Sequence, residues 1–266
     1  MHRAPADTNS YWPVRGLLRG LEVLRVLNRL PVGTGSVATI ARETGLHRTT
    51  VKRLLESLLQ AGFVRVVSGG REYRLTFRVR ELSAGFEDDA WVSEVAGPLL
   101  RELTDAVKWP SDLVTLEGDE LVVRESTHPF SPLSFRGGAL GVRVPLLRTA
   151  VGRAYLSWCP DDERDALLML LGSRDDAQGR EARDEARVHR LIERTRDCGY
   201  AVSSSTEQPD ESRFGAIAVP VRRAPGVVAC INIVFLLRAA SADSIAAAAL
   251  SRLLTTARAI ESALVD

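Results

Sequence analysis

The chain has 266 residues, of which 45% are hydrophobic and 26% charged, and its formal net charge is +1. This length suits one small domain and one of ordinary size. No apolar run approaches the roughly 20 residues of a membrane-spanning helix, which argues against a membrane partner. Three widely separated cysteines favour a reducing cytoplasm over a disulfide framework. We therefore expect a cytoplasmic protein.

Residues 1–13, MHRAPADTNSYWP, lack the apolar core of a signal peptide and predict a flexible tail. A helix is predicted next, with basic residues near its start and an apolar stripe along it, made by Arg15, Arg19, Leu17, Leu21, Leu24, Val26 and Leu27. Pro31 and the glycines of residues 33–35 end this helix, and Ser36 suits the N-cap of the next one. The GTG run at 33–35 partly matches a dinucleotide-binding fingerprint, but it follows a helix instead of a strand, which favours a turn.

Residues 36–59, SVATIARETGLHRTTVKRLLESLL, carry two short helical patterns hinged at Gly45. A small residue at Ala41, a glycine able to take positive φ and an apolar anchor at Val51 let two helices cross closely. The second helix keeps apolar residues on its inner face and presents a polar face of His47, Arg48, Thr49, Thr50, Lys52 and Arg53. Such a helix can enter the major groove of DNA. A helical hairpin with a solvated basic face is the alternative.

Residues 63–76, FVRVVSGGREYRLT, alternate apolar and polar residues on both sides of a Ser-Gly-Gly turn, which predicts a β-hairpin. A hairpin directly after a helix-turn-helix is a wing, so residues 14–76 are predicted to form a winged helix-turn-helix that binds double-stranded DNA. We expect base-edge or groove contacts from Arg48, Thr49, Thr50 and Arg53. We expect phosphate contacts from Arg15, Arg19, Ser36, Lys52 and, at the tip of the wing, Arg71.

Charge divides the chain at the end of this region. Residues 14–80 hold 13 Arg and Lys against 4 Glu, a net charge of +9, whereas residues 81–266 carry −8. The basic part would approach phosphates, and the acidic part would stay away from them. Residues 77–91 place Val79, Leu82 and Phe86 on one face. This pattern predicts a linker helix that packs against a second copy of the chain.

Residues 92–266 have the pattern of an α+β domain with a mixed or antiparallel sheet. Two strands are predicted within 112–125 around a Gly118-Asp119 turn, and two more over Gly215–Val221 and Val227–Leu236. Helices are predicted to start at Val92 and to cover residues 149–159, 161–171, 183–198 and 241–264. A loop rich in Pro, Gly and Ser from His128 to Thr149 has the composition of a segment that surrounds a ligand.

The stretches RGLEVLRVLNRL, IARETGLHRTTVKRLLESLLQAGFV, YRLTFRVREL, GRAYLSWCP, RTRDCGYAVSS and IAVPVRRAPGVVACINIVF resemble the IclR-type bacterial transcriptional regulators. Within that family, GLHRTTVKRLLE, LTFRVRELSAGF, VVRESTHPFSPLSF and VPLLRTAVG resemble the activators of phenylpropionate and hydroxyphenylpropionate catabolism. The resemblance implies a winged helix-turn-helix, a linker helix and a GAF-like effector-binding domain. It also implies a homodimer or dimer of dimers on DNA, in which a small organic effector alters the engagement of DNA or RNA polymerase.

By resemblance, a ligand carboxylate lies near a helix N-terminus at Thr149, Ala150, Val151 and Gly152, where backbone N–H groups bind anions. Strands at Ala216, Cys230 and Asn232 would line the other side. Further apolar contacts would come from Phe130, Leu133, Phe135, Leu146 and Tyr155, each of which could equally belong to the core. Family members that bind very small acids often carry a serine pair where this chain has Asn232 and Val234. Ala216, in turn, stands where the family often has cysteine. A pocket with so few polar groups favours an aromatic acid.

The expected function is therefore effector-controlled activation of an aromatic-acid catabolic operon. The alternatives are a repressor that responds to a non-aromatic small acid, an enzyme with a DNA-binding appendage, and an architectural DNA-binding protein. The chain has no GxSxG, HExxH or Walker motif, and its four histidines are scattered, so no catalytic residue, cofactor or metal is predicted. Ser203–Ser205 read as a solvated loop, and His128 either faces the effector or lies in a surface loop.

Overall fold

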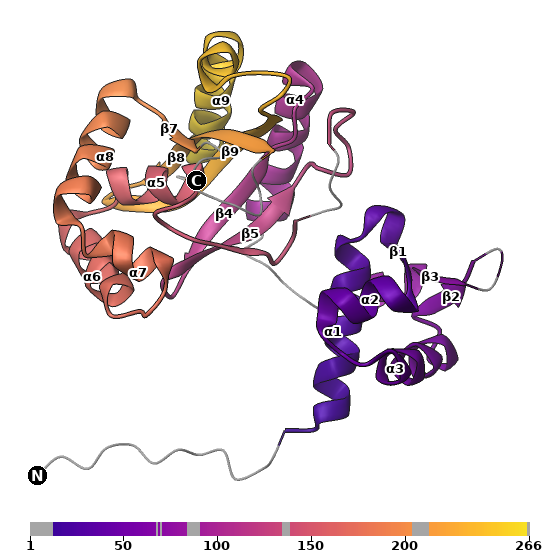
Figure 1. Cartoon of the computed structure of the whole chain (residues 1–266). Coiled ribbons are helices and arrows are strands. Elements are labelled where there is room, and N and C mark those ends of the chain that lie inside the picture. The colour runs from indigo at the N-terminus through magenta and orange to yellow at the C-terminus, as the bar shows by residue number, and fades with distance from the viewer. Residues whose placement is uncertain are drawn as a thin grey trace, which may run out of the picture. The chain divides into compact units, whose positions relative to one another are not determined.

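The computed structural model describes residues 13–67, 69, 71–83, 91–134, 139–203 and 213–264. Its contacts divide the chain into two compact units, Met1–Phe86 and Glu87–Asp266, which are coloured indigo to purple and magenta to yellow in Figure 1. Several predicted features lie outside the described residues: tail residues 1–12, Ser68 and Gly70 of the wing turn, Phe86 of the linker and Phe135.

The first unit contains three helices and a small antiparallel sheet. The helices are α1 (Arg15–Arg29), α2 (Val37–Thr44) and α3 (Arg48–Gln60), and the strands are β1 (Thr34–Ser36), β2 (Val64–Val66) and β3 (Glu72–Leu75), in the order β1-β3-β2. The core consists of Val23, Val26, Leu27, Ile40, Ala41, Val51, Leu55, Val64 and Tyr73. The predicted helix-turn-helix is thus confirmed. Strand β1 was not predicted, because its Thr-Gly-Ser sequence has the composition of a turn and it becomes a strand only by pairing with β3.

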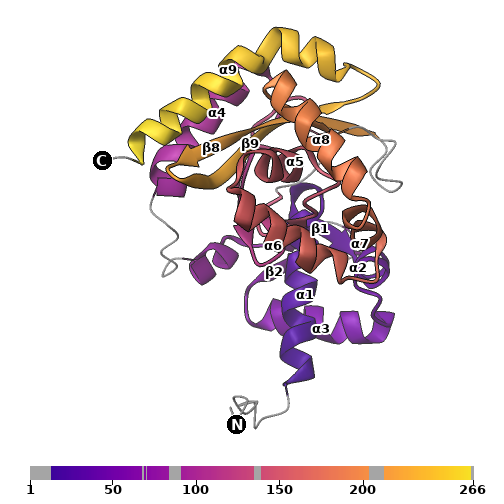
Figure 2. The same ribbon diagram turned by 90° about the vertical axis from the view of Figure 1, so that its left-hand side faces the viewer.

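Local interactions set the turns of this unit. The Ser36 hydroxyl accepts the Thr39 N–H at 3.1 Å, as expected of an N-cap. Gly45 ends α2 with φ of +67°, a conformation that costs other residues about 1–2 kcal/mol. The predicted apolar stripe of α1 is wrong in its first half, because Leu17 and Leu21 are 62% and 42% exposed. The first turns of α1 extend past α2 and α3 (Figures 1 and 2), so no other described helix or strand of this unit covers them.

The second unit is built on a six-stranded sheet in the order β6-β5-β4-β9-β8-β7, and its described strand pairs are all antiparallel. The strands are β4 (Asp112–Glu117), β5 (Glu120–Ser126), β6 (Arg143–Val144), β7 (Ala201–Ser203), β8 (Phe214–Arg223) and β9 (Gly226–Leu236). Both predicted hairpins are present. The edge strands β6 and β7 were missed because two or three residues are too few to show alternation.

Helices cover both faces of this sheet (Figure 2). On one face lie α4 (Gly97–Val107), which continues a π-helical turn at Val92–Ala96, and α9 (Ala242–Ala263). On the other lie α5 (Ala150–Trp158), α6 (Asp161–Gly172), α7 (Ala177–Ala182) and α8 (Glu185–Cys198). Strand β8 alternates between the faces, with Ile217 and Val219 toward α4 and α9, and Ala216 and Ala218 toward α5. These small alanines leave space beneath α5.

The predicted linker helix differs from the structure in its first part. Residues Phe77–Ser83 form a 3-10 helix instead of an α-helix, with Phe77 and Leu82 exposed. Residues 84–90 lie outside the described part of the chain. Among the helices that are described, none combines the length and the apolar character needed to cross a membrane.

Candidate functional site

Helix α3 presents a polar face to solvent in the first unit. Arg48, Thr49 and Arg53 are exposed on it, and Thr50 is half-buried. Within the described residues, neither Arg48 nor Arg53 has a side-chain hydrogen bond or ion pair to the protein. Their guanidinium groups can therefore contact DNA without breaking an internal interaction. His47 is engaged locally instead, because its Nδ1 lies 2.8 Å from Thr49 Oγ1 and caps the helix.

Lys52 connects the same helix to the wing. Its ammonium lies 2.6 Å from Glu56 Oε1 and 2.5 Å from the hydroxyl of Tyr73 on β3, and that hydroxyl donates to Glu56 at 3.1 Å. The hydrogen bond to Glu56 is the main cause that raises the Lys52 pKa, and the same bond lowers the pKa of Glu56. The predicted phosphate contact of Lys52 would compete with this arrangement, which holds the wing against α3.

The other residues predicted to contact phosphates lie on separate elements of the unit. Arg15 and Arg19 are exposed on the first turns of α1, and Arg71 is exposed immediately before β3. The Ser36 hydroxyl is already bonded within α2, to the Thr39 N–H and hydroxyl. A phosphate at Ser36 would therefore be bound by backbone N–H groups more readily than by the side chain.

A cavity of about 380 Å³ lies in the second unit, between the sheet and the start of α5. Its apolar wall includes Val114, Val123, Val142, Val144, Val151, Phe214 and Val234. Its polar lining comprises Asp112, His128, Arg143, Arg148, Thr149, Ser203 and Asn232. Five of the residues predicted for the effector line it, namely Thr149, Ala150, Val151, Ala216 and Asn232.

The N-terminus of α5 opens onto this cavity. The Thr149 hydroxyl donates to the Pro145 carbonyl at 2.7 Å and accepts the Gly152 N–H at 3.1 Å. The N–H groups of Ala150 and Val151 belong to the first turn, so the helix itself offers them no acceptor. Together with the helix dipole they favour an anion here. Arg148 adds a positive charge, with its Nε 3.5 Å from Glu181.

Gly152, predicted to lie near the ligand carboxylate, is not part of the cavity lining and has a packing role at the start of α5. A Cβ at this position would lie 2.1 Å from the Leu146 carbonyl oxygen and 2.4 Å from its Cα. Glycine is therefore required because the segment before α5 passes directly over the helix. This close approach fixes Thr149 and the first N–H groups of α5 at the cavity.

The remaining predicted effector residues do not line the cavity. Phe130 is 61% exposed and its ring lies 5.8 Å from the Arg101 guanidinium, while Leu133 is also exposed. Leu146 and Tyr155 belong to the buried core, which was the alternative interpretation, and Cys230, which was expected to line the pocket, is also a core residue. The Tyr155 hydroxyl donates to Glu163. Burial is the main cause that raises the pKa of Tyr155, and this hydrogen bond is the second.

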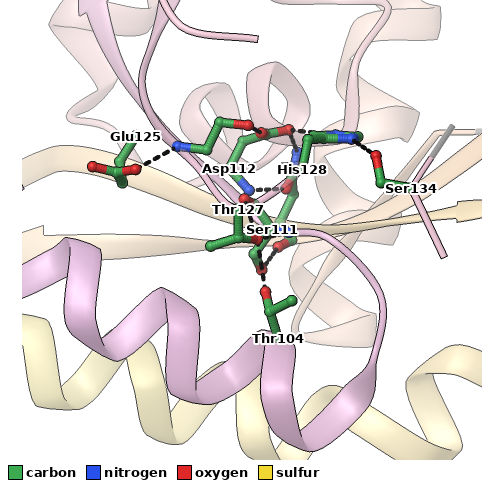
Figure 3. A network of polar contacts seen from close by, with 9 residues as sticks. Thr104, Ser111, Asp112, Glu125, Thr127, His128 and Ser134 are labelled. Atoms are coloured by element: carbon green, nitrogen blue, oxygen red, sulfur yellow. Dashed lines mark hydrogen bonds and ion pairs between the residues drawn. The ribbon is translucent and has the colours of Figure 1, made fainter. Parts of the chain in front are cut away.

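Sequence reasoning missed a buried polar cluster at the open end of the β4–β5 hairpin (Figure 3). Asp112 Oδ1 accepts the Ser126 hydroxyl at 2.7 Å, and the Asp112 N–H donates to Asn232 Oδ1 at 2.7 Å. His128 Nδ1 lies 2.7 Å from the Ser134 hydroxyl, and its Nε2 lies 3.7 Å from Asp112 Oδ2. The surface-loop interpretation of His128 is wrong, since this residue is 6% exposed and lines the cavity. Register could have revealed the cluster, because Asp112 and Ser126 are cross-strand partners.

A chain of hydrogen bonds continues from this cluster to α4. The Ser111 hydroxyl donates to the Asn232 carbonyl at 2.5 Å, and the Ser111 N–H donates to the Thr127 hydroxyl at 2.8 Å. That hydroxyl lies 2.6 Å from the hydroxyl of Thr104 on α4 (Figure 3). The cavity is thereby linked through buried polar contacts to the helix that opens the second unit.

The arrangement is suited to binding a ligand. Ser203, predicted to lie in a solvated loop, pairs with Ala216 as part of β7 and lines the cavity.

In the part of the chain that the structure describes, no three His, Cys, Asp or Glu side chains gather as metal ligands. Burial raises the pKa of the Cys159 thiol to about 12, and that of Cys230 well above its ordinary value. Neither thiol is therefore available as a nucleophile.

Comparison with known proteins assigns both units. Residues 16–68 match the IclR helix-turn-helix domain, and residues 88–262 match the bacterial transcriptional regulator IclR C-terminal domain. The Pca regulon regulatory protein of Pseudomonas putida is 28% identical over 221 residues, 82% of this chain and 72% of that protein.

Solved structures agree with this assignment. An IclR family transcriptional regulator from Brucella abortus has a TM-score of 0.57 at 26% identity, over 98% of this chain and 96% of that one. An IclR homologue from Microbacterium hydrocarbonoxydans, in complex with 4-hydroxybenzoate, has the same fold, with a TM-score of 0.57 at 21% identity over 93% and 98% of the two chains. The two matching families and the relatives from Pseudomonas putida and Brucella abortus are regulators and not enzymes. The chain belongs to the IclR family of bacterial transcriptional regulators.

Proposed function

We propose that the protein is an effector-responsive activator of an operon for the catabolism of an aromatic acid, such as phenylpropionate or hydroxyphenylpropionate. The observation that carries this proposal is the cavity, which combines an apolar wall made mostly of valines with seven polar side chains and a helix N-terminus that favours an anion. The 4-hydroxybenzoate complex is of a protein only 21% identical to this chain, and at that identity the likeness shows a common fold and not a common ligand. The ligand class is therefore argued from the residues of this chain.

Volume and lining favour a ring over a short acid. Small-molecule sites usually enclose about 300–1,000 Å³, and this cavity of about 380 Å³ lies at the lower end of that range. A two- or three-carbon acid would leave much of the apolar wall without contacts. An aromatic ring would contact Val114, Val123 and Val234, while its carboxylate takes the N–H groups of Ala150 and Val151 beside Arg148.

On DNA, α3 would enter the major groove with Arg48 and Arg53 toward base edges, and Arg15, Arg19 and Arg71 would contact phosphates. Two copies, paired through residues 77–91, would place two such helices on successive half-sites. The effector would act by binding more tightly to one arrangement of the dimer than to another. Because the protein is proposed to be an activator, the arrangement of the dimer that the effector favours would recruit RNA polymerase.

Calorimetry tests the ligand class. Phenylpropionate and its hydroxylated relatives should bind the full-length protein, whereas glyoxylate and pyruvate should bind at least tenfold more weakly or not at all. Binding of the short acids with no binding of the aromatic ones would overturn the proposal. In vitro transcription then distinguishes the two directions of control. An activator raises the amount of transcript when it is added together with the bound acid. A repressor lowers the amount of transcript when it is added without the acid, and the acid relieves this loss.

A further inference from the structure

We infer that Asp112 and His128 form a subsite for a hydroxyl group on the effector, so that the preferred ligand is a hydroxylated aromatic acid. This inference rests on the proposed function, because it assumes that an aromatic acid occupies the cavity. It narrows the ligand class, and it assigns a recognition role to Asp112, which the sequence did not single out, and to His128, for which the sequence left two positions open.

The two oxygens of the Asp112 carboxylate differ in their partners. Oδ1 accepts the Ser126 hydroxyl at a short 2.7 Å. The partners of Oδ2 are distant, with Asn232 Nδ2 at 3.4 Å and His128 Nε2 at 3.7 Å. Hydrogen bonds to a carboxylate normally span about 2.7–2.9 Å, so Oδ2 retains capacity for a further donor. The carboxylate is 8% exposed, and Asp112 lines the cavity.

His128 supplies the complementary group. Its Nδ1 is 2.7 Å from the Ser134 hydroxyl, and its ring lies between Ser134 and Asp112 (Figure 3). The 3.7 Å separation of Nε2 and Oδ2 is too long for a direct hydrogen bond. A ligand hydroxyl beside both atoms could donate to Oδ2 and accept from an Nε2–H. Both buried groups would then have a partner at normal distance.

Charge decides which ligand group takes this place. A carboxylate beside Asp112 would face a like charge in a buried environment, which is unfavourable. The ligand carboxylate therefore belongs at the α5 N-terminus, and the neutral donor belongs at Asp112. A phenolic hydroxyl is the donor that an aromatic acid can carry without a second negative charge at neutral pH.

The subsite is held in place before the ligand arrives. Asp112 is fixed by Ser126 and, through its own N–H, by the side chain of Asn232. Asn232 is fixed in turn by the bond from Ser111 to its carbonyl. A hydrogen bond to a charged, preorganised acceptor should favour the hydroxylated ligand by roughly 10- to 100-fold in Kd.

Calorimetry on the full-length wild-type protein tests this with four ligands: 3-phenylpropionate, its 3-hydroxy and 4-hydroxy derivatives, and the methoxy derivative of whichever isomer binds better. One hydroxy isomer should bind roughly 10- to 100-fold more tightly than phenylpropionate. The methoxy compound accepts a hydrogen bond but cannot donate one, so it should bind no better than phenylpropionate. Equal affinity for the hydroxy and unsubstituted acids would overturn the inference and leave the proposed function intact.

A variant assigns the preference to the residue. Asp112→Asn should reduce the hydroxyl preference, which is the ratio of the Kd of phenylpropionate to the Kd of its better-binding hydroxy derivative, to about threefold or less. Asp197→Asn, at an exposed position of α8, is the matched control and should retain the full preference. A preference that persists in Asp112→Asn contradicts the subsite. Absence of binding by all of these acids to the wild type would overturn the proposed function and this inference with it.

Discussion

Replacement of Gly152 by alanine should destabilise the effector-binding unit because the segment before α5 crosses directly over this residue. A Cβ would lie 2.1 Å from the Leu146 carbonyl oxygen, so backbone must move by close to 1 Å to restore even a 3.0 Å separation. Overpacking of this kind costs about 1–3 kcal/mol, and a backbone partner cannot rotate away, which favours the upper value. The gain from replacing glycine in a helix, about 0.5–1 kcal/mol, leaves a net loss of about 2 kcal/mol.

Urea unfolding followed by tryptophan fluorescence measures this loss, since three of the four tryptophans lie beyond residue 87. With a slope of about 2 kcal/mol per molar urea, the midpoint should fall by about 1 M. Gly172→Ala is the matched control, because its Cβ would meet nothing nearer than Arg183 Cγ at 3.7 Å. A Gly152→Ala midpoint equal to that of the wild type would refute the close-approach argument.

Three further predictions follow from the structure. Arg48→Ala should weaken DNA binding by about 1–3 kcal/mol and relax the sequence preference at one base pair. A DNA footprint with unchanged sequence preference would exclude a base contact by Arg48. Gly45→Ala should lower stability by about 1–2 kcal/mol through its positive φ alone, since no atom lies within 4 Å of the new Cβ. Gly16→Ala, equally open, should be neutral or stabilising. Burial raises the pKa of Cys159 to about 12 and that of Cys230 above its ordinary value near 9. The two thiols therefore lose their protons at a lower pH in the unfolded chain than in the folded one. The urea midpoint should therefore fall as pH rises from about 9 toward 12, and less steeply in Cys230→Ala.

The DNA-binding unit could be predicted almost completely because its signals are local. The N-cap at Ser36, the glycine at position 45 and the alternation on both sides of the wing turn each specify a backbone conformation within a few residues. Strand β1 and the exposed first half of α1 depend on what lies beside them in space. The hydrophobic periodicity of those residues predicts neither the pairing of β1 with β3 nor the extension of α1 past α2 and α3.

The cavity could be predicted only in part. Thr149, Ala150, Val151, Ala216 and Asn232 were found because the resemblance carries their positions. Asp112 was missed and His128 was left between the effector site and a surface loop, because the two residues begin and follow strands and meet only through the hairpin register. The role of Gly152 was also missed, since a backbone that passes over a helix leaves no pattern in sequence.

Effector control of DNA binding can be measured by the anisotropy of labelled DNA from the region upstream of the encoding gene, titrated with the full-length protein with and without each acid. We predict salt-sensitive, sequence-specific binding whose affinity or saturation changes with a hydroxylated aromatic acid and not with acetate or glyoxylate. Specific binding that no aromatic acid alters would contradict effector control through the cavity. Absence of specific binding would contradict the assignment of α3 as the recognition helix.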